Sequence, residues 1–337
     1  MSLSEKDRTE ILMMIGYGDR RRSTNEVLQT LGNTDVPIIG ILSQETFSVN
    51  SLFPGISYDS FIAASYVKYL ESAGARVVPI MIGKNKEYYK ELINNTNGIL
   101  FPGGATFFNQ SDGYADAGQI IYDIALELNQ NGDYYPIWGT CLGMELMVHV
   151  ALGGKEVRSH CSATKISMPL EFKADFRTSK LFSNAPDDIV EDLTNLDITY
   201  NSHNYCLTEE TFEENNLLND WQIISTNKDV NDFEFISVFE SKRYPFYSIQ
   251  FHPEKANFEF KSSLLIPHTA EAIKSSQYFA NFFIEEAKRN NHKYPDWRSE
   301  QQAMIYNYSP HFTALQNSSY LQLYMFKESD ENSVLLV

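Results

Sequence analysis

Apolar and polar residues follow two different periods along the chain from about residue 36 onward. Short continuous apolar runs occupy residues 37–42, 76–81, 98–101 and 135–139, and residues 247–252 return to the same character. Runs of this length without polar alternation are typical of strands that are buried on both faces of a parallel sheet.

Segments with apolar residues at helical spacing lie between these runs. They cover residues 60–73, 88–93, 118–131, 141–150 and 271–289. Gly74 stands where a left-handed C-terminal cap belongs. This alternation predicts an α/β protein, a three-layer α/β/α fold with a mostly parallel central sheet and right-handed crossovers. Alternating segments at 166–170, 221–225 and 235–239 predict antiparallel edge strands.

The pattern also divides the chain. Residues 1–35 show no clean period and carry a run of three arginines, Arg20 to Arg22, so they are predicted to form a loosely attached arm. Residues 36–310 form the predicted catalytic domain, and residues 311–337 are predicted to be a C-terminal tail.

Composition and charge narrow the choice of partners. The formal net charge of −17 gives a long-range field that repels phosphate backbones and anionic lipid, so nucleic acid and membranes are not expected as partners. No apolar run approaches the length of a membrane span, and no signal peptide is recognisable. The three cysteines, Cys141, Cys161 and Cys206, are too sparse for a disulfide framework, and their odd number leaves at least one thiol free.

Cys141 lies between two glycines, where a predicted strand runs into a predicted helix. A nucleophile on such a sharp turn projects above the sheet, and the flanking glycines allow the strained bend. The N-terminus of the following helix is expected to favour thiolate over thiol. The backbone N–H of Leu142 is then free to face an oxyanion, and Gly104, in the loop after the strand at 98–101, is expected to supply the second oxyanion donor.

His252 and Glu254 follow the last core strand. Residues two apart on an extended segment face the same way, so the carboxylate is expected to hold the imidazole while the imidazole faces Cys141. These three residues supply a nucleophile, a base and an orienting group. A lone cysteine is more often a small buried residue, but here three motifs all follow predicted strands, at the sheet edge where α/β sites collect.

These motifs resemble the class I glutamine amidotransferase superfamily. The segments concerned are Gly-Thr-Cys-Leu-Gly at 139–143, Phe-Pro-Gly-Gly at 101–104 and Gln-Phe-His-Pro-Glu at 250–254. Longer stretches are similar to one branch, the γ-glutamyl hydrolase family, namely residues 37–42, 64–79, 98–104, 138–145, 201–203, 235–237 and 286–291. The resemblance covers about residues 36–310.

The resemblance implies removal of glutamates from poly-γ-glutamyl folates and antifolates, without a metal or an organic cofactor. It assigns the nucleophile to Cys141 and the general acid/base to His252, with Glu254 beside it. It also implies a lysosomal, vacuolar or secreted glycoprotein that forms a homodimer. The sequons at Asn94, Asn109, Asn307 and Asn317 add little, because an asparagine-rich chain produces such triplets by chance.

Family position places three further residues in the substrate site. His203 is expected there, although a hydrogen-bonded loop histidine is the plain alternative. Glu145 replaces the glutamine that is usual in amidotransferases, and it either positions the scissile γ-glutamyl unit or is a structural carboxylate paired with a cation. Arg76, with Lys68 as a second candidate, is expected to bind α-carboxylates, against the alternative of a surface or helix-packing role.

Two other functions use the same fold. A glutaminase subunit would use the same three residues but needs a synthase partner, and no synthase domain fits into the roughly 30 residues left at each end. A catalytically inactive binding protein would not need an intact triad. A glutaminase assay and preferential labelling of Cys141 by iodoacetate separate these alternatives from a hydrolase.

Overall fold

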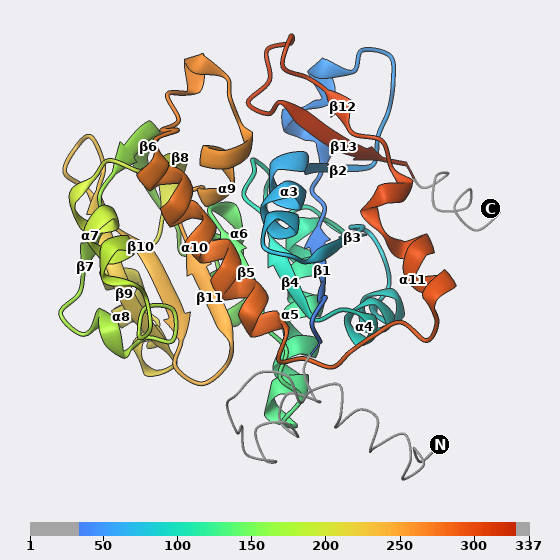
Figure 1. Ribbon diagram of the computed structural model, residues 1–337, viewed down its shortest axis with the longest axis horizontal. Coiled ribbons are helices and arrows are strands. Elements are labelled where there is room, and N and C mark those ends of the chain that lie inside the picture. The colour runs from blue at the N-terminus through green and yellow to red at the C-terminus, as the bar shows by residue number, and fades with distance from the viewer. Residues whose placement is uncertain (1–33, 328–337) are drawn as a thin grey trace, which may run out of the picture. The chain divides into compact units, whose positions relative to one another are not determined.

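The computed structural model describes residues 34–327, and every structural statement below concerns these residues (Figure 1). Residues 34–327 belong to one compact unit. The predicted arm up to residue 33, with its arginine run, lies outside the described residues, as do residues 328–337 of the predicted tail.

An eight-stranded sheet forms the centre of this unit. Its order is β3 (Arg76–Ile80), β1 (Ile38–Leu42), β4 (Gly98–Phe101), β5 (Ile137–Thr140), β11 (Phe246–Ile249), β10 (Glu234–Ser241), β9 (Trp221–Lys228) and β7 (Glu171–Phe172). The first five strands are parallel, and β10, β9 and β7 pair antiparallel. The predicted mostly parallel sheet with antiparallel edge strands is therefore confirmed.

Helices cover both faces of this sheet. One face carries α3 (Ala64–Ser72), α7 (Asp187–Asn195), α9 (Pro253–Phe258) and α10 (Ala270–Ala287), and α10 crosses the sheet in Figure 1. The other carries α4 (Lys86–Asn95), α5 (Tyr114–Gln130), α6 (Leu142–Ala151) and α8 (Glu209–Glu214). Successive residues of one strand enter different cores: Trp138 of β5 packs with α10, whereas Ile137 packs on the α5 and α6 side. This alternation is the physical reason for continuous apolar strands.

The helix predicted at residues 60–73 is only partly correct. Its first four residues form β2 (Ser60–Ala63), which pairs with β13 (Gln322–Phe326), and β12 (His311–Phe312) completes this small sheet. The helical part ends before Gly74, whose φ of +93° confirms the left-handed cap. The first half of the predicted tail is thus folded, because its apolar alternation pairs with a strand some 260 residues earlier, a contact that local pattern does not reveal.

A two-stranded sheet of β6 (Ser159–Met168) and β8 (Thr199–Cys206) stands apart from the central sheet. The segment at 166–170 was expected at the edge of the central sheet, and the structure corrects its partner. A disulfide joins Cys161 to Cys206, and Cys141 keeps a free thiol. The expectation of a free thiol is confirmed, whereas the sparse cysteines do form one disulfide.

The last helix, α11 (Trp297–Ala303), lies on the chain between α10 and the small sheet. None of the helices within residues 34–327 has both the length and the apolar character needed to cross a membrane.

Candidate active site

The order β4–β5–β11 brings the three sequence motifs together. Gly103 comes two residues after β4, Cys141 directly after β5, and His252 three residues after β11. These strands are parallel neighbours, so their carboxyl ends meet at one edge of the sheet. A Cβ atom built on Gly103 would lie 2.8 Å from Cε1 of His252 and 3.0 Å from Cβ of Cys141. Cys141 and His252 therefore both lie against Gly103, where any side chain would collide with them.

Cys141 occupies a strained turn between β5 and α6. Its φ of 53° and ψ of −110° lie where side chains other than glycine rarely occur, and such strain collects at functional sites. The turn is tight because α6 lies directly on the sheet. A Cβ on Gly143 would come within 1.9 Å of the Phe101 carbonyl oxygen, and one on Gly139 within 2.6 Å of the Gly143 oxygen. Both glycines are thus needed for close packing rather than for left-handed backbone.

Protonation of Cys141 differs from the sequence expectation. Burial raises the pKa of the thiol well above its usual value, and the carboxylates Glu145 and Glu254 add to the increase. A hydrogen bond from the Leu142 N–H and the positive charge of Lys255 oppose it without overcoming it. The helix N-terminus therefore does not by itself make a thiolate, because loss of solvation outweighs one N–H bond. A base must take the proton.

His252 and Glu254 form the pair that the sequence predicted, on a different local structure. His252 is the N-cap of α9 and Glu254 lies in its first turn, rather than both on an extended strand. The His252 Nδ1 and Glu254 Oε1 atoms are 2.8 Å apart. Burial lowers the pKa of His252, although Glu254 pulls it upward, so the resting imidazole is neutral. Burial works against ionised Glu254, but the His252 contact prevails and keeps the pKa of that carboxyl below its usual value.

The oxyanion donors are arranged around Tyr66 of α3. The Gly103 N–H donates to Tyr66 Oη over 2.8 Å, and Tyr66 Oη lies 3.3 Å from His252 Nδ1. The N–H of the next residue, Gly104, has no hydrogen-bond acceptor within residues 34–327. The Leu142 N–H points at the sulfur of Cys141. The roles of Gly104 and Leu142 as oxyanion donors therefore stay predictions.

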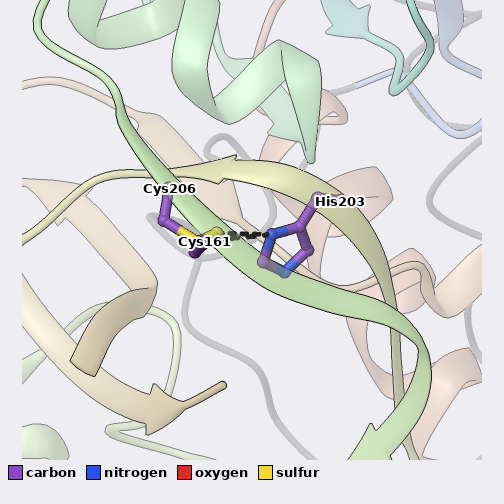
Figure 2. A group of neighbouring side chains, drawn as sticks. All are labelled: Cys161, His203 and Cys206. Carbon is purple, nitrogen blue, oxygen red and sulfur yellow. Dashed lines mark hydrogen bonds between the residues drawn. A yellow bond between two sulfur atoms is a disulfide. The ribbon is translucent and has the colours of Figure 1, made fainter. Parts of the chain in front are cut away.

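His203 lies on β8, the strand that also contacts the catalytic pair. The His252 N–H donates to the Tyr200 carbonyl oxygen of β8 over 2.8 Å. His203 is only 5% exposed, and burial, together with the nearby His252, lowers the pKa of His203 to about 3. It contacts Asn201 and both disulfide sulfurs, rather than Cys141. The structure therefore places His203 against the Cys161–Cys206 disulfide (Figure 2).

The chain is similar to proteins of known function. A family model described as Peptidase C26 matches residues 37–254, which contain all three motifs. The chain is 39% identical to gamma-glutamyl hydrolase B of Dictyostelium discoideum over 92% of this chain and 88% of that one. It is 40% identical to the gamma-glutamyl hydrolases of Rattus norvegicus and Homo sapiens, over 86% of this chain and 89% of each. The chain belongs to the peptidase C26 family of γ-glutamyl hydrolases. It is a hydrolase, as the motifs predicted.

In this C26 hydrolase Glu145 is paired with a cation that the sequence analysis did not identify. Arg158 Nη1 lies 3.0 Å from Glu145 Oε2, and Arg158 also holds Glu156. The guanidinium is stacked 4.1 Å from the centre of the Phe108 ring. Burial raises the pKa of Glu145 to about 7 although Arg158 opposes the shift. The structural alternative for Glu145, a buried carboxylate with a cation, matches this arrangement, and one turn of helix separates it from Cys141.

Arg76 and Lys68 do not meet the triad. Arg76 is the first residue of β3 and so stands at the amino edge of the sheet, where it pairs with Glu300 and the Val36 carbonyl oxygen. Lys68 bonds to Gln322 of the small sheet. The structure favours a surface or packing role for both residues, since Cys141 and His252 lie at the opposite, carboxyl edge of the sheet.

Lys255 is the cation that the C26 hydrolase places beside its triad. It follows Glu254 on α9, is 5% exposed, and its Nζ lies 4.9 Å from the centre of the Tyr320 ring. Its charge lowers the pKa of both Cys141 and Glu254, so it stands within electrostatic reach of the two. Sequence reasoning missed Lys255 because a lysine next to a motif looks like a solvated surface residue. Its position directly after the His-Pro-Glu segment is the sequence feature that could have indicated a role in the site.

Proposed function

We propose that this hydrolase cleaves γ-glutamyl amide bonds of poly-γ-glutamyl folates and antifolates through a thioacyl-enzyme. The observation that carries the proposal is the open space at Gly103, which Cys141 and His252 border together. The names of the relatives, about 40% identical over most of the chain, support the same bond type.

The first half of the cycle forms the thioacyl-enzyme. His252 Nδ1 is held by Glu254, so Nε2 is the nitrogen left to accept a proton. It takes the proton of Cys141 as the sulfur bonds to the γ-carbonyl carbon, and the N–H groups of Gly104 and Leu142 receive the developing oxyanion. The resulting imidazolium is stabilised by Glu254, as in other nucleophile–histidine–acid systems.

Breakage of the C–N bond completes the thioacyl-enzyme, and hydrolysis of the C–S bond then releases the second product. The imidazolium gives its proton to the departing α-amino nitrogen as the C–N bond breaks, and the shortened polyglutamate or glutamate leaves. Water then loses a proton to His252 and attacks the thioester carbon, which returns the thiol to Cys141. Both halves use the same neutral imidazole, which is the resting state that burial favours.

Lys255 is proposed to hold an α-carboxylate of the substrate. The chain carries a net charge of −17, so a polyanionic substrate needs a local cation against the global field. Arg158 is already neutralised by Glu145 and Glu156. The Nζ atom of Lys255 contacts the Tyr320 ring but forms no hydrogen bond within residues 34–327, which leaves its three N–H donors available.

An aromatic pair at the end of the Gly103–Gly104 loop is proposed to contact the pteroyl group. Phe47 and Phe107 are 52% and 63% exposed, and their ring centres are 6.3 Å apart. Thr106, next to Phe107, is anchored by Glu45, two residues before Phe47. We expect Phe107→Ala to raise KM for pteroyl-polyglutamates by roughly 2- to 10-fold, since stacking on one ring is worth about 0.5–1.5 kcal/mol, and to leave KM for free poly-γ-glutamate unchanged. Equal effects on both substrates would contradict the assignment.

Mass spectrometry of the products of a defined pteroyl-pentaglutamate tests the proposed function. Shortened pteroyl-glutamates are the expected products, and trapping at low pH should show Cys141 carrying the acyl mass. The rival function, a glutaminase subunit, predicts ammonia from free glutamine at a higher kcat/KM than cleavage of the pteroyl substrate. That outcome would overturn the proposal.

A lysosomal, vacuolar or secreted location and a homodimer remain part of this proposal. The Cys161–Cys206 disulfide supports an oxidising compartment, where such bonds persist. The four sequon asparagines, Asn94, Asn109, Asn307 and Asn317, are all exposed. Expression in a eukaryotic cell, followed by glycosidase treatment of the secreted protein and light scattering of its mass, tests both points.

A further inference from the structure

The contacts of His203 determine which of its two ring nitrogens carries the proton. Nε2 lies 3.0 Å from Asn201 Oδ1. The orientation of this amide is set by its own Nδ2, which donates to the Thr199 carbonyl oxygen over 2.9 Å. Nε2 must therefore carry the proton in the neutral ring. Burial keeps the ring neutral at physiological pH, since it lowers the pKa of His203 to about 3.

The other nitrogen, Nδ1, is then a bare lone pair. Its neighbours are the Tyr205 carbonyl oxygen at 3.1 Å, Cys161 Sγ at 3.5 Å and Cys206 Sγ at 3.4 Å. In the disulfide form none of these atoms carries a hydrogen, so the lone pair of a buried imidazole has no donor. A buried polar group without a partner is costly. Two thiols or a metal ion in place of the disulfide would supply what Nδ1 lacks.

The three atoms are already spaced like ligands of one ion (Figure 2). All of them lie within 4.8 Å of one another. Zinc bonds of about 2.3 Å to sulfur and about 2.0–2.1 Å to nitrogen give a tetrahedron whose N···S edges are roughly 3.5 Å. The two Nδ1–Sγ distances match these edges. Only the two sulfurs need to separate, to roughly 3.8 Å, and the 6.0 Å between the Cα atoms leaves room for this.

Charge and access also fit a cation. Two thiolates and a neutral imidazole balance the charge of one Zn²⁺, so no net charge is buried. Cys161 lines a surface depression of about 580 Å³ together with Ser162, Asp229 and Phe233. Reductant, metal and a water as fourth ligand can reach the sulfur from that side.

We propose that Cys161, Cys206 and His203 form a redox-gated zinc site, closed by the disulfide and opened by its reduction. Reduction adds two electrons and two protons to the S–S bond while two molecules of a thiol reductant join as their own disulfide. Zn²⁺ then binds both sulfurs and His203 Nδ1, and the two thiol protons leave to solvent. The zinc and the disulfide are alternative cross-links between β6 and β8, the strand whose Tyr200 carbonyl oxygen holds the His252 N–H.

The test measures metal binding in the Cys141→Ala chain, so that the catalytic thiol cannot contribute and the result is independent of the proposed function. After reduction with a phosphine and removal of the reagent, the chain is titrated with ZnCl₂ against a chromogenic chelator. We expect one tightly bound Zn²⁺ per chain, release of two protons, and a thiolate charge-transfer band when Co²⁺ replaces zinc. The oxidised chain should bind none.

Two variants in the same background assign the ligands. His203→Gln keeps both cysteines, and should weaken zinc binding by more than about 100-fold, since changes outside the first shell already cost 10–100-fold. Cys161→Ser should abolish binding, with its fold checked by circular dichroism. Zinc should also restore the melting temperature that reduction lowers. Equal zinc affinity in His203→Gln, or the same binding by oxidised and reduced chains, would overturn the site.

Discussion

A cysteine lies near a histidine in two places within residues 34–327. The two places differ in whether the thiol is free and in the group that holds the histidine. At the sheet edge, Cys141 is a free thiol on a strained turn, and its histidine is held by the carboxylate Glu254. In the two-stranded sheet of β6 and β8, Cys161 is bonded to Cys206, and His203 is held by the amide of Asn201.

The difference lies in the third group. A carboxylate can stabilise an imidazolium, so His252 can take a proton from Cys141 despite its burial. An amide oxygen cannot do so, and burial, together with the nearby His252, lowers the pKa of His203 to about 3. Proximity of cysteine and histidine therefore does not define a catalytic pair. We propose proton transfer at the first place, whereas the second place holds a cross-link.

The largest expected effect comes from removing the first cysteine. Cys141→Ala should leave the fold intact, because the side chain is small, and should lower kcat by at least about 10⁴-fold, the usual cost of losing a member of such a triad. The measurement is release of glutamate from a pteroyl-polyglutamate, with circular dichroism as the control for folding. Substantial residual hydrolysis would refute the assignment of the nucleophile.

The carboxylate is the next largest contribution. Glu254→Gln should lower kcat by about 10²–10⁴-fold, because the imidazolium loses its stabilising charge. Glu254 also raises the pKa of His252 against the effect of burial. Without it that pKa falls further, so the acid limb of the kcat/KM profile should move to lower pH. An acid limb that moves to higher pH would show that another group than His252 titrates there.

Replacement of Lys255 should weaken substrate binding more than it slows the chemical step. Lys255→Met should raise KM for polyglutamate about tenfold or more, since a hydrogen bond to a charged group is worth about 1.5–3 kcal/mol, with a smaller change in kcat. Arg76→Met is the matched control, because that arginine pairs with Glu300 at the opposite edge of the sheet. If Arg76→Met raises KM and Lys255→Met does not, the carboxylate site is misplaced.

The smallest effect on activity is expected from the second cysteine pair. Cys161→Ser should retain most of the hydrolase activity but lower the free energy of unfolding by about 2–4 kcal/mol, because the disulfide closes a 45-residue separation. Chemical denaturation of the oxidised variant and of the oxidised parent measures this loss. A drop in kcat like that of Cys141→Ala would mean that both cysteines act in catalysis.

Much of the catalytic centre was predictable because its information is local. Gly139 and Gly143 around Cys141, and the apolar runs before each motif, follow from strand period and from the close approach of α6 to the sheet. The helix containing Glu254 was missed, since a proline can begin a helix as readily as continue a strand. The prediction that Glu254 contacts His252 is still correct, because a strand and the first turn of a helix both bring a residue two positions away within reach.

Other features depend on segments distant in sequence. Lys255 and Tyr320, or Arg158 and Glu145, are neighbours only after folding. The same is true of the Cys161–Cys206 disulfide, whose partners stand on β6 and β8. The protonation of Cys141 was predicted from the helix N-terminus alone, and burial reversed it, which no local pattern reveals.

By itself, the sequence determined the alternation of strands and helices, and it predicted both the sheet edge for the chemistry and the candidate nucleophile, base and carboxylate. These depend on periodicity and on residues adjacent in the chain. The tertiary structure alone decided the strand order that places β4, β5 and β11 side by side, the cations that face the triad and the pKa of every buried group. Those properties depend on which distant side chains exclude water from one another, and solvation is a property of the folded protein.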